Sequence, residues 1–187
     1  MTNHNNELSG SKLRTARLRL SKFIGSEARR TAGELGFGWQ PTSIAPDDLD
    51  ALRAEFQACH VSGRPLRVLR DFSDVTIYDR PETNWAFRYM HDTRHVWLSA
   101  DFSTEAELAV ASCHLARAKA EGLSPGSLEY ELLLADTVGQ TLYMARTHRF
   151  VTNQLQFALD CIRFDLDSAI EREARLTTLE TLLIIGC

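Results

Sequence analysis

The chain has 187 residues, of which 44% are hydrophobic and 25% charged, and its formal net charge is −4. This size and composition suit one globular domain with a substantial core. The apolar runs are far shorter than the roughly 18 residues of a membrane-spanning helix, so no contact with a membrane is expected. The cysteines lack CxxC spacing, which argues against a zinc ribbon or a disulfide framework and favours a reduced, cytoplasmic protein; they are Cys59, Cys113, Cys161 and Cys187.

Positive charge is concentrated near the N-terminus. Residues 1–30 carry seven basic and two acidic side chains, a local charge of +5, which leaves −9 on residues 31–187. We therefore divide the chain into a basic N-terminal helical arm, residues 1–32, and a helical domain, residues 33–187. The arm is expected to contact phosphates of nucleic acid or carboxylates of a protein through Arg14, Arg17, Arg19 and Lys22. Because no aromatic residues alternate with the basic ones, a helix that folds back on the acidic body is the simpler alternative.

The first half of the chain predicts two helices and a small sheet. Residues 11–30 suit an amphipathic helix, and a turn-rich connector with three glycines follows. A second helix is predicted from Pro46 to about Cys59. The β-prone segments 66–70 and 75–78 are separated by a short polar stretch, so they predict a β-hairpin.

From Glu82 onward the pattern is helical, with breaks near residues 101, 121–126 and 149–152. Thr104 and Glu107 have the spacing of a capping box, and Ser124-Pro125 predicts the next helix start. The last helical stretch is expected from Asn153 to about residue 184, with a kink allowed. The predicted fold is therefore mainly α: a single-domain helical bundle with a small β-hairpin.

The segment His91-Asp92-Thr93-Arg94-His95 is the strongest candidate for chemistry. Residues four apart share one face of a helix, so the two imidazoles can bind one metal ion together. A second polar feature is Asp136, which lies in an apolar run with Gln140 four residues later. A buried carboxylate needs a partner charge or a metal. A candidate site for one divalent ion thus contains His91, Asp92, His95 and Asp136.

Two families of metalloenzyme resemble parts of this pattern. His60, His91-Asp92 and Asp136 follow the order H…HD…D of the HD-domain phosphohydrolases, which implies one or two divalent metals that activate water. His60, however, falls at a predicted helix end, away from that family's usual placement. The HDxxH segment also looks like the HExxH helix of zinc peptidases, with a shorter carboxylate. Glu105 or Glu107 would be a third ligand, although the capping box already explains Glu107.

The interpretation of this cluster that we favour needs no ion. It is a satisfied polar network that fixes the packing of two helices, formed by Arg88, His91, Asp92, His95, Asp136 and Gln140. In this interpretation no residue is catalytic and no cofactor is required. His114 and His148 are expected to be ordinary surface or capping residues of helices.

A further resemblance covers about residues 64–160. It is carried by Phe87-Arg88-x-x-His91-Asp92-x-x-His95, Asp101-Phe102-Ser103, Glu107, Asp136-Thr137-x-Gly139-Gln140 and Arg149-Phe150. These motifs are similar to those of uncharacterised accessory proteins of plasmids, phages and integrative elements. The resemblance implies a protein that binds a host or element-encoded macromolecule stoichiometrically, as anti-CRISPR inhibitors do. The expected function is such a binding protein with a protein or nucleoprotein partner, and the alternative is a metal-dependent phosphohydrolase.

Overall fold

The computed structural model describes the backbone of residues 9–185 and the side chains of residues 9–176. In chain order the elements are α1 (Gly10–Leu35), β1 (Trp39–Thr42), α2 (Leu49–Ser62), β2 (Leu66–Leu69), α3 (Pro81–Leu98), α4 (Thr104–Ala120), α5 (Leu128–Leu134), the π-helical turn η1 (Ala135–Gly139), α6 (Gln140–Thr147), α7 (Gln154–Arg163) and α8 (Leu166–Ile185). The predicted mainly α class is confirmed. None of the described helices is both long and apolar enough to cross a membrane.

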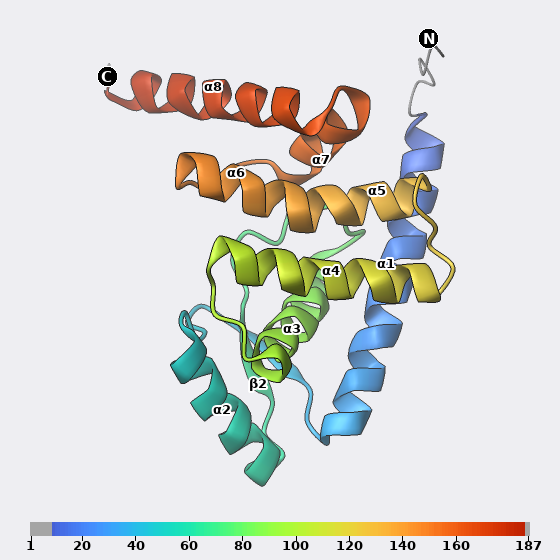
Figure 1. Ribbon diagram of the computed structural model, residues 1–187, viewed down its shortest axis with the longest axis vertical. Helices are drawn as coiled ribbons and strands as arrows, with labels where there is room; N and C mark the ends of the chain where they lie inside the picture. Colours follow the sequence, from blue (N-terminus) through green and yellow to red (C-terminus); the bar gives the residue numbers. More distant parts are fainter. Residues whose placement is uncertain (1–8, 186–187) are drawn as a thin grey trace.

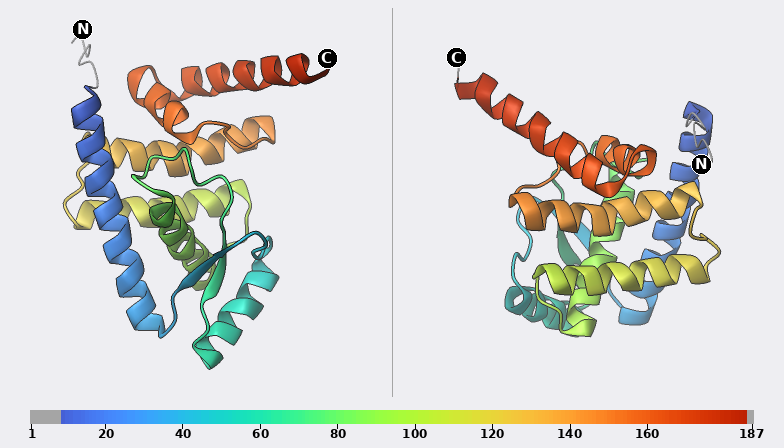
Figure 2. Two further views of the ribbon diagram at one scale, coloured as in Figure 1. Left: turned by 180° about the vertical axis from the view of Figure 1, so that it is seen from behind. Right: turned by 45° about the horizontal axis from the view of Figure 1, so that its top comes forward.

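The helix α4 and the continuous helix formed by α5, η1 and α6 lie side by side, and α1 crosses their ends (Figure 1). The other views agree (Figure 2). Helix α3 packs against α4, while α7 packs on α5 and η1, on the side that faces away from α4, and α8 packs on α7. The largest core cluster combines side chains from α1, both strands, α3 and α5; they include Leu20, Ile24, Leu66, Val68, Tyr89, Leu132 and Leu133. Helix α3 therefore lies at the centre of the fold, in contact with α1, α2, both strands and α4.

Helix α1 is amphipathic, as its sequence predicts. Ser9 caps its N-terminus by accepting a hydrogen bond from the amide of Lys12, and Gly36 ends it with a φ of +79°. Leu20 and Ile24 are fully buried against α3 and α5. One face of this basic helix is thus part of the main core.

The sheet differs from the predicted hairpin. Strands β1 and β2 pair in parallel, with Trp39 opposite Leu66, and α2 provides the crossover between them. The segment 75–78 forms no strand in this structure. Its carbonyl groups bind elsewhere: Arg17 of α1 donates to the carbonyl oxygens of Thr76, Ile77 and Tyr78. The hairpin prediction was wrong because a side chain takes the backbone acceptors that a second strand would need.

Helix boundaries in the second half also differ locally from the predictions. The N-cap of α4 is Ser103, whose Oγ accepts from the amide of Ala106, so Glu107 lies outside the cap. The N-cap of α5 is Ser127, three residues after the predicted start. The last helical stretch is divided between α7 and α8, where Asp165 accepts a hydrogen bond from the amide of Ser168 at 2.7 Å. Short polar side chains of comparable capping strength compete at each of these ends.

A buried ion pair joins α1 to α4. The Glu27 side chain is only 7% exposed and accepts hydrogen bonds from Arg117 Nε at 2.6 Å and from Arg30 Nη2 at 2.8 Å. Burial alone would raise the pKa of the Glu27 carboxyl, but the bonds from Arg117 and Arg30 outweigh it and lower the pKa to about 2. The carboxylate therefore stabilises the fold above its ordinary pKa of 4.5, and this contribution is lost as the pH falls toward 2.

We expect Glu27→Gln to lower the free energy of unfolding at pH 7 by about 2 kcal/mol, because Arg117 loses its charged partner. Urea unfolding at pH 7 and pH 3 measures this loss, which should fall by half or more at pH 3. Glu34→Gln is the control: this carboxylate also binds Arg30, but it is 53% exposed and should contribute about 0.5 kcal/mol or less. An equal loss at both pH values would contradict the prediction.

Candidate metal centre

Three side chains from two helices bring potential metal ligands together. His91 and His95 come from one face of α3, and Glu107 comes from the first turns of α4. His91 Nε2 lies 3.0 Å from His95 Nε2 and 3.2 Å from Glu107 Oε2, while His95 Nε2 lies 3.4 Å from Glu107 Oε1. The three ligand atoms all lie within 4.8 Å of one another. They are close enough to bind one ion after small movements of the side chains.

The ring of His95 is oriented by the end of its own helix. Ser99 adopts φ +53° and ends α3, which turns the carbonyl oxygen of Ala100 back to within 3.0 Å of His95 Nδ1. A carbonyl oxygen can only accept, so Nδ1 donates to it and Nε2 is the nitrogen that faces Glu107. The side chain is fully buried. His95 is therefore held in the orientation that a metal ligand requires, with Nε2 free to exchange its proton for a cation.

The charges at this centre reinforce one another. Burial alone would raise the pKa of the Glu107 carboxyl, but hydrogen bonds from His91 and His95 outweigh it and lower the pKa to about 2. Burial alone would lower the pKa of His95, but Glu107 raises it above its ordinary value. Two imidazole nitrogens 3.0 Å apart repel unless a proton or a cation lies between them. The arrangement therefore favours positive charge where its three donor atoms meet.

Asp92 and Asp136 lie outside this group of donor atoms. Asp136, on the π-helical turn, accepts hydrogen bonds from Tyr78 Oη at 3.3 Å and from Gln140 Nε2 at 2.6 Å. Burial raises the pKa of Asp136 to about 7 and that of Asp92 to about 6, and the positive charge of Arg88 opposes both shifts. Asp136 thus belongs to a second, half-buried polar cluster with Tyr78 and Gln140, whereas Asp92 interacts electrostatically with His91, His95 and Arg88.

Neither enzyme resemblance is reproduced in full. His60 is exposed near the C-terminal end of α2, where its ring contacts Phe37. Among the described residues, the group that could hold a metal contains neither His60 nor Asp136, so the H…HD…D order does not converge on one ion. His91, His95 and a glutamate from the following helix do converge. Asp92 follows the first histidine, in the position of the glutamate of an HExxH helix.

Glu107 and His114 lie in surroundings that differ from those predicted from the sequence. Glu107 faces the histidines because the cap begins at Ser103, one residue before the predicted Thr104. His114, expected at a surface, is buried, and its ring stacks on His91 with centroids 5.7 Å apart and planes 12° apart. Burial lowers the pKa of His114 well below its ordinary value. The available signal was the spacing of seven residues between Glu107 and His114, which places both on one face of α4.

The arm residues are divided between internal contacts and solvent. Arg17 binds the carbonyl groups of segment 76–78, and Arg19 forms an ion pair with the buried Glu129 at 2.9 Å. Arg14 and Lys22 are exposed. Two of the four side chains that were predicted to contact a partner, Arg17 and Arg19, therefore also stabilise the fold.

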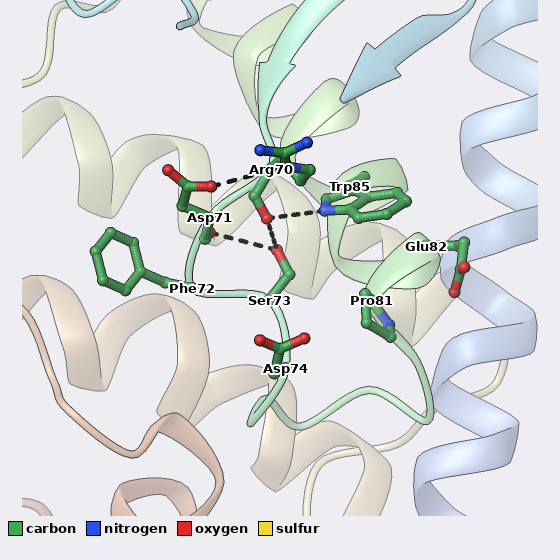
Figure 3. A pocket seen from close by; sticks show the side chains of 8 residues that line it. All are labelled: Arg70, Asp71, Phe72, Ser73, Asp74, Pro81, Glu82 and Trp85. Atoms are coloured by element: carbon green, nitrogen blue, oxygen red, sulfur yellow. Dashed lines mark hydrogen bonds and ion pairs between the residues drawn. The ribbon is translucent and has the colours of Figure 1, made fainter. Parts of the chain in front are cut away.

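A cavity of about 350 Å³ lies between the loop after β2 and the start of α3 (Figure 3). Trp85 Nε1 donates to the carbonyl oxygen of Arg70 at 3.1 Å, and Phe72 points away from the other labelled side chains. Phe72 has a φ of +57° and is 79% exposed. The lining residues are Arg70, Asp71, Phe72, Ser73, Asp74, Pro81, Glu82 and Trp85, so the cavity shares no residue with the metal centre.

The chain matches no known protein family, no curated protein and no solved structure in these three comparisons. The functional interpretation therefore rests on the arrangement of His91, His95 and Glu107.

Proposed function

We propose that the protein is a metal-dependent enzyme, whose centre is one divalent ion bound by His91, His95 and Glu107. The observation that carries this proposal is the convergence of their ligand atoms within 4.8 Å, from two adjacent helices. The orientation of His95 by the carbonyl group of Ala100 supports it, because ligating histidines usually bind such a partner through their other ring nitrogen.

The ligand set favours catalysis over a purely structural role. Two imidazoles and one carboxylate are the protein ligands of several catalytic zinc sites, whereas structural zinc sites usually have four protein ligands. Such a set leaves a coordination position for water or a substrate oxygen, and a divalent ion there would polarise that oxygen. The same nitrogen and oxygen donors also suit iron or manganese. The chain itself contributes the fixed orientation of the His95 ring and a half-buried carboxylate, Asp92, beside the first ligand on α3.

The function implied by the mobile-element resemblance finds less support. A stoichiometric binding protein would use the basic arm, but Arg17 and Arg19 already bind groups of the same chain. A phosphohydrolase would be consistent with a divalent ion, although the ligands differ from the H…HD…D set. We therefore place phosphoesters first among the substrates to assay, and we keep the cytoplasm as the proposed location.

Protein purified without a histidine tag or chelator should contain about one equivalent of zinc, manganese or iron by elemental analysis. His91→Ala and Glu107→Gln should each lose nearly all of it, because removal of one of three ligands typically costs far more affinity than the 10–100-fold of an outer-shell change. His60→Ala is the matched control, since this exposed histidine lies outside the group and should keep its metal.

Circular dichroism would verify that each variant is folded. The proposal is wrong if wild-type protein takes up no metal even after incubation with zinc, manganese or ferrous ions. It is also wrong if the His60→Ala variant loses metal to the same degree as the His91→Ala variant.

A further inference from the structure

Two nitrogen atoms beside the metal centre are buried without hydrogen-bond partners. In the described part of the chain, His91 Nδ1 and His114 Nε2 are both enclosed, and neither has a protein donor or acceptor within bonding distance. They belong to neighbouring rings, which lie almost parallel with centroids 5.7 Å apart. An unsatisfied buried polar atom destabilises a folded protein, so two of them on neighbouring rings call for an explanation.

The two histidine ligands differ in how their other nitrogen is held. The carbonyl group of Ala100 holds Nδ1 of His95, whereas Nδ1 of His91 has no such partner. If His91 binds a metal through Nε2, then Nδ1 must carry the proton and becomes a buried donor. The nearby His114 Nε2 can accept a hydrogen bond when its ring is in the Nδ1–H tautomer.

We infer that His114 is a positioning residue for the ligand His91, joined to it by one buried water molecule. This water accepts from His91 Nδ1 and donates to His114 Nε2, so it satisfies both atoms at once. The two rings are neighbours and neither nitrogen has a partner in the protein, so one bridging water can serve both. The inference rests on the proposed metal centre and assigns to His114 the role that Ala100 has for His95.

Two substitutions separate this role from simple packing. Phenylalanine at position 114 keeps a flat ring against Phe87 and His91 but cannot form a hydrogen bond. Glutamine loses the ring but keeps a side-chain oxygen that accepts. His114→Phe should therefore weaken zinc binding about 10–100-fold, the usual effect of losing an outer-shell partner, and His114→Gln should weaken it by no more than about threefold.

Zinc affinity is measured by competition with a chelating indicator, and stability by thermal unfolding without metal. His114→Phe should be the more stable variant, because the phenyl ring preserves packing. His114→Gln should bind zinc more tightly, because the glutamine amide preserves the hydrogen bond. If His114→Gln binds zinc more weakly than His114→Phe, or if neither variant changes the affinity, the inference is overturned while the metal centre stands. A wild-type protein that binds none of zinc, manganese and ferrous ions overturns the proposed function and this inference with it.

The wild-type protein provides a test that needs no variant. With [15N]histidine labelling and bound zinc, long-range 1H–15N correlation spectra report the tautomer of each neutral imidazole. His114 should be in the Nδ1–H form, with Nε2 accepting. Observation of the Nε2–H form would overturn the inference.

Discussion

Arg88→Met should lower the free energy of unfolding at pH 8 by about 3 kcal/mol, because two hydrogen bonds donated by its charged, half-buried side chain are lost. Arg88, on α3, donates to the carbonyl oxygen of Leu69 at the end of β2 and to that of Asp71 at 2.8 Å. Its positive charge also opposes the rise in the pKa of Asp92 and Asp136. The methionine variant would leave two carbonyl groups without their donor and would remove a positive charge that acts on both carboxyl groups.

The loss caused by Arg88→Met should depend on pH. Burial already raises the pKa of Asp136 to about 7 and that of Asp92 to about 6, above their ordinary value of 3.8. An acid with a raised pKa destabilises the folded state progressively as the pH increases through that range, and removal of Arg88 extends the range upward. Urea unfolding in the presence of a chelator should therefore show a larger loss at pH 8 than at pH 5.

Arg70→Met is the matched control for Arg88→Met. Arg70 is 58% exposed and lies 3.8 Å from Asp71, so its removal should cost about 0.5 kcal/mol or less. A loss for Arg88→Met that is equally small would show that Arg88 is not needed to hold α3 against β2.

Gly139→Leu should destabilise the protein by about 3 kcal/mol, the upper part of the range for overpacking. A Cβ atom at Gly139 would lie 3.2 Å from Phe157 Cε1, 3.5 Å from Leu166 Cδ1 and 3.6 Å from Cys161 Sγ. The remaining atoms of leucine would have to displace α7 from the end of the π-helical turn. Thermal or urea unfolding measures the loss, and faster reaction of Cys161 with a thiol reagent would report the displacement.

Gly33→Leu is the control for this substitution. Gly33 also lies in a helix, but a Cβ atom there would meet nothing within 4 Å. Leucine should be tolerated there or should stabilise the protein by up to about 1 kcal/mol, through its higher helix propensity. If both leucine variants were as stable as the wild type, the close approach of α7 to Gly139 would be wrong.

The sequence predicted the helices better than the contacts between them. Hydrophobic periodicity correctly predicted an amphipathic helix over residues 11–30, and its Leu20 and Ile24 are buried because a helix must bury its apolar face. The hairpin prediction was wrong because strand pairing depends on residues that are far apart in the chain. Strand β2 pairs with β1, which precedes α2, and Arg17 binds the backbone of segment 76–78. The β-propensity of a short segment does not predict which strand or side chain will bind its backbone groups.

The candidate site could be predicted only in part for a similar reason. The spacing of His91 and His95 is a local property of one helix, so it could be read directly. Glu107 was assigned to a capping box with Thr104. The N-cap is instead Ser103, one residue earlier and equally suited to capping, so the Glu107 carboxylate is not needed there and faces α3. The stacking of His114 on His91 depends on how two helices pack, which a single sequence does not specify.

The placement of α1 also has a consequence for synthesis on the ribosome. Its buried face packs on α3 and α5, and Glu27 pairs with Arg117, ninety positions later in the chain. Helix α1 leaves the exit tunnel before α5 and therefore keeps its apolar face open to solvent until α5 has emerged. Packing of α1 in the nascent protein must wait for α5, and during that interval its apolar face is accessible to chaperones and to wrong partners.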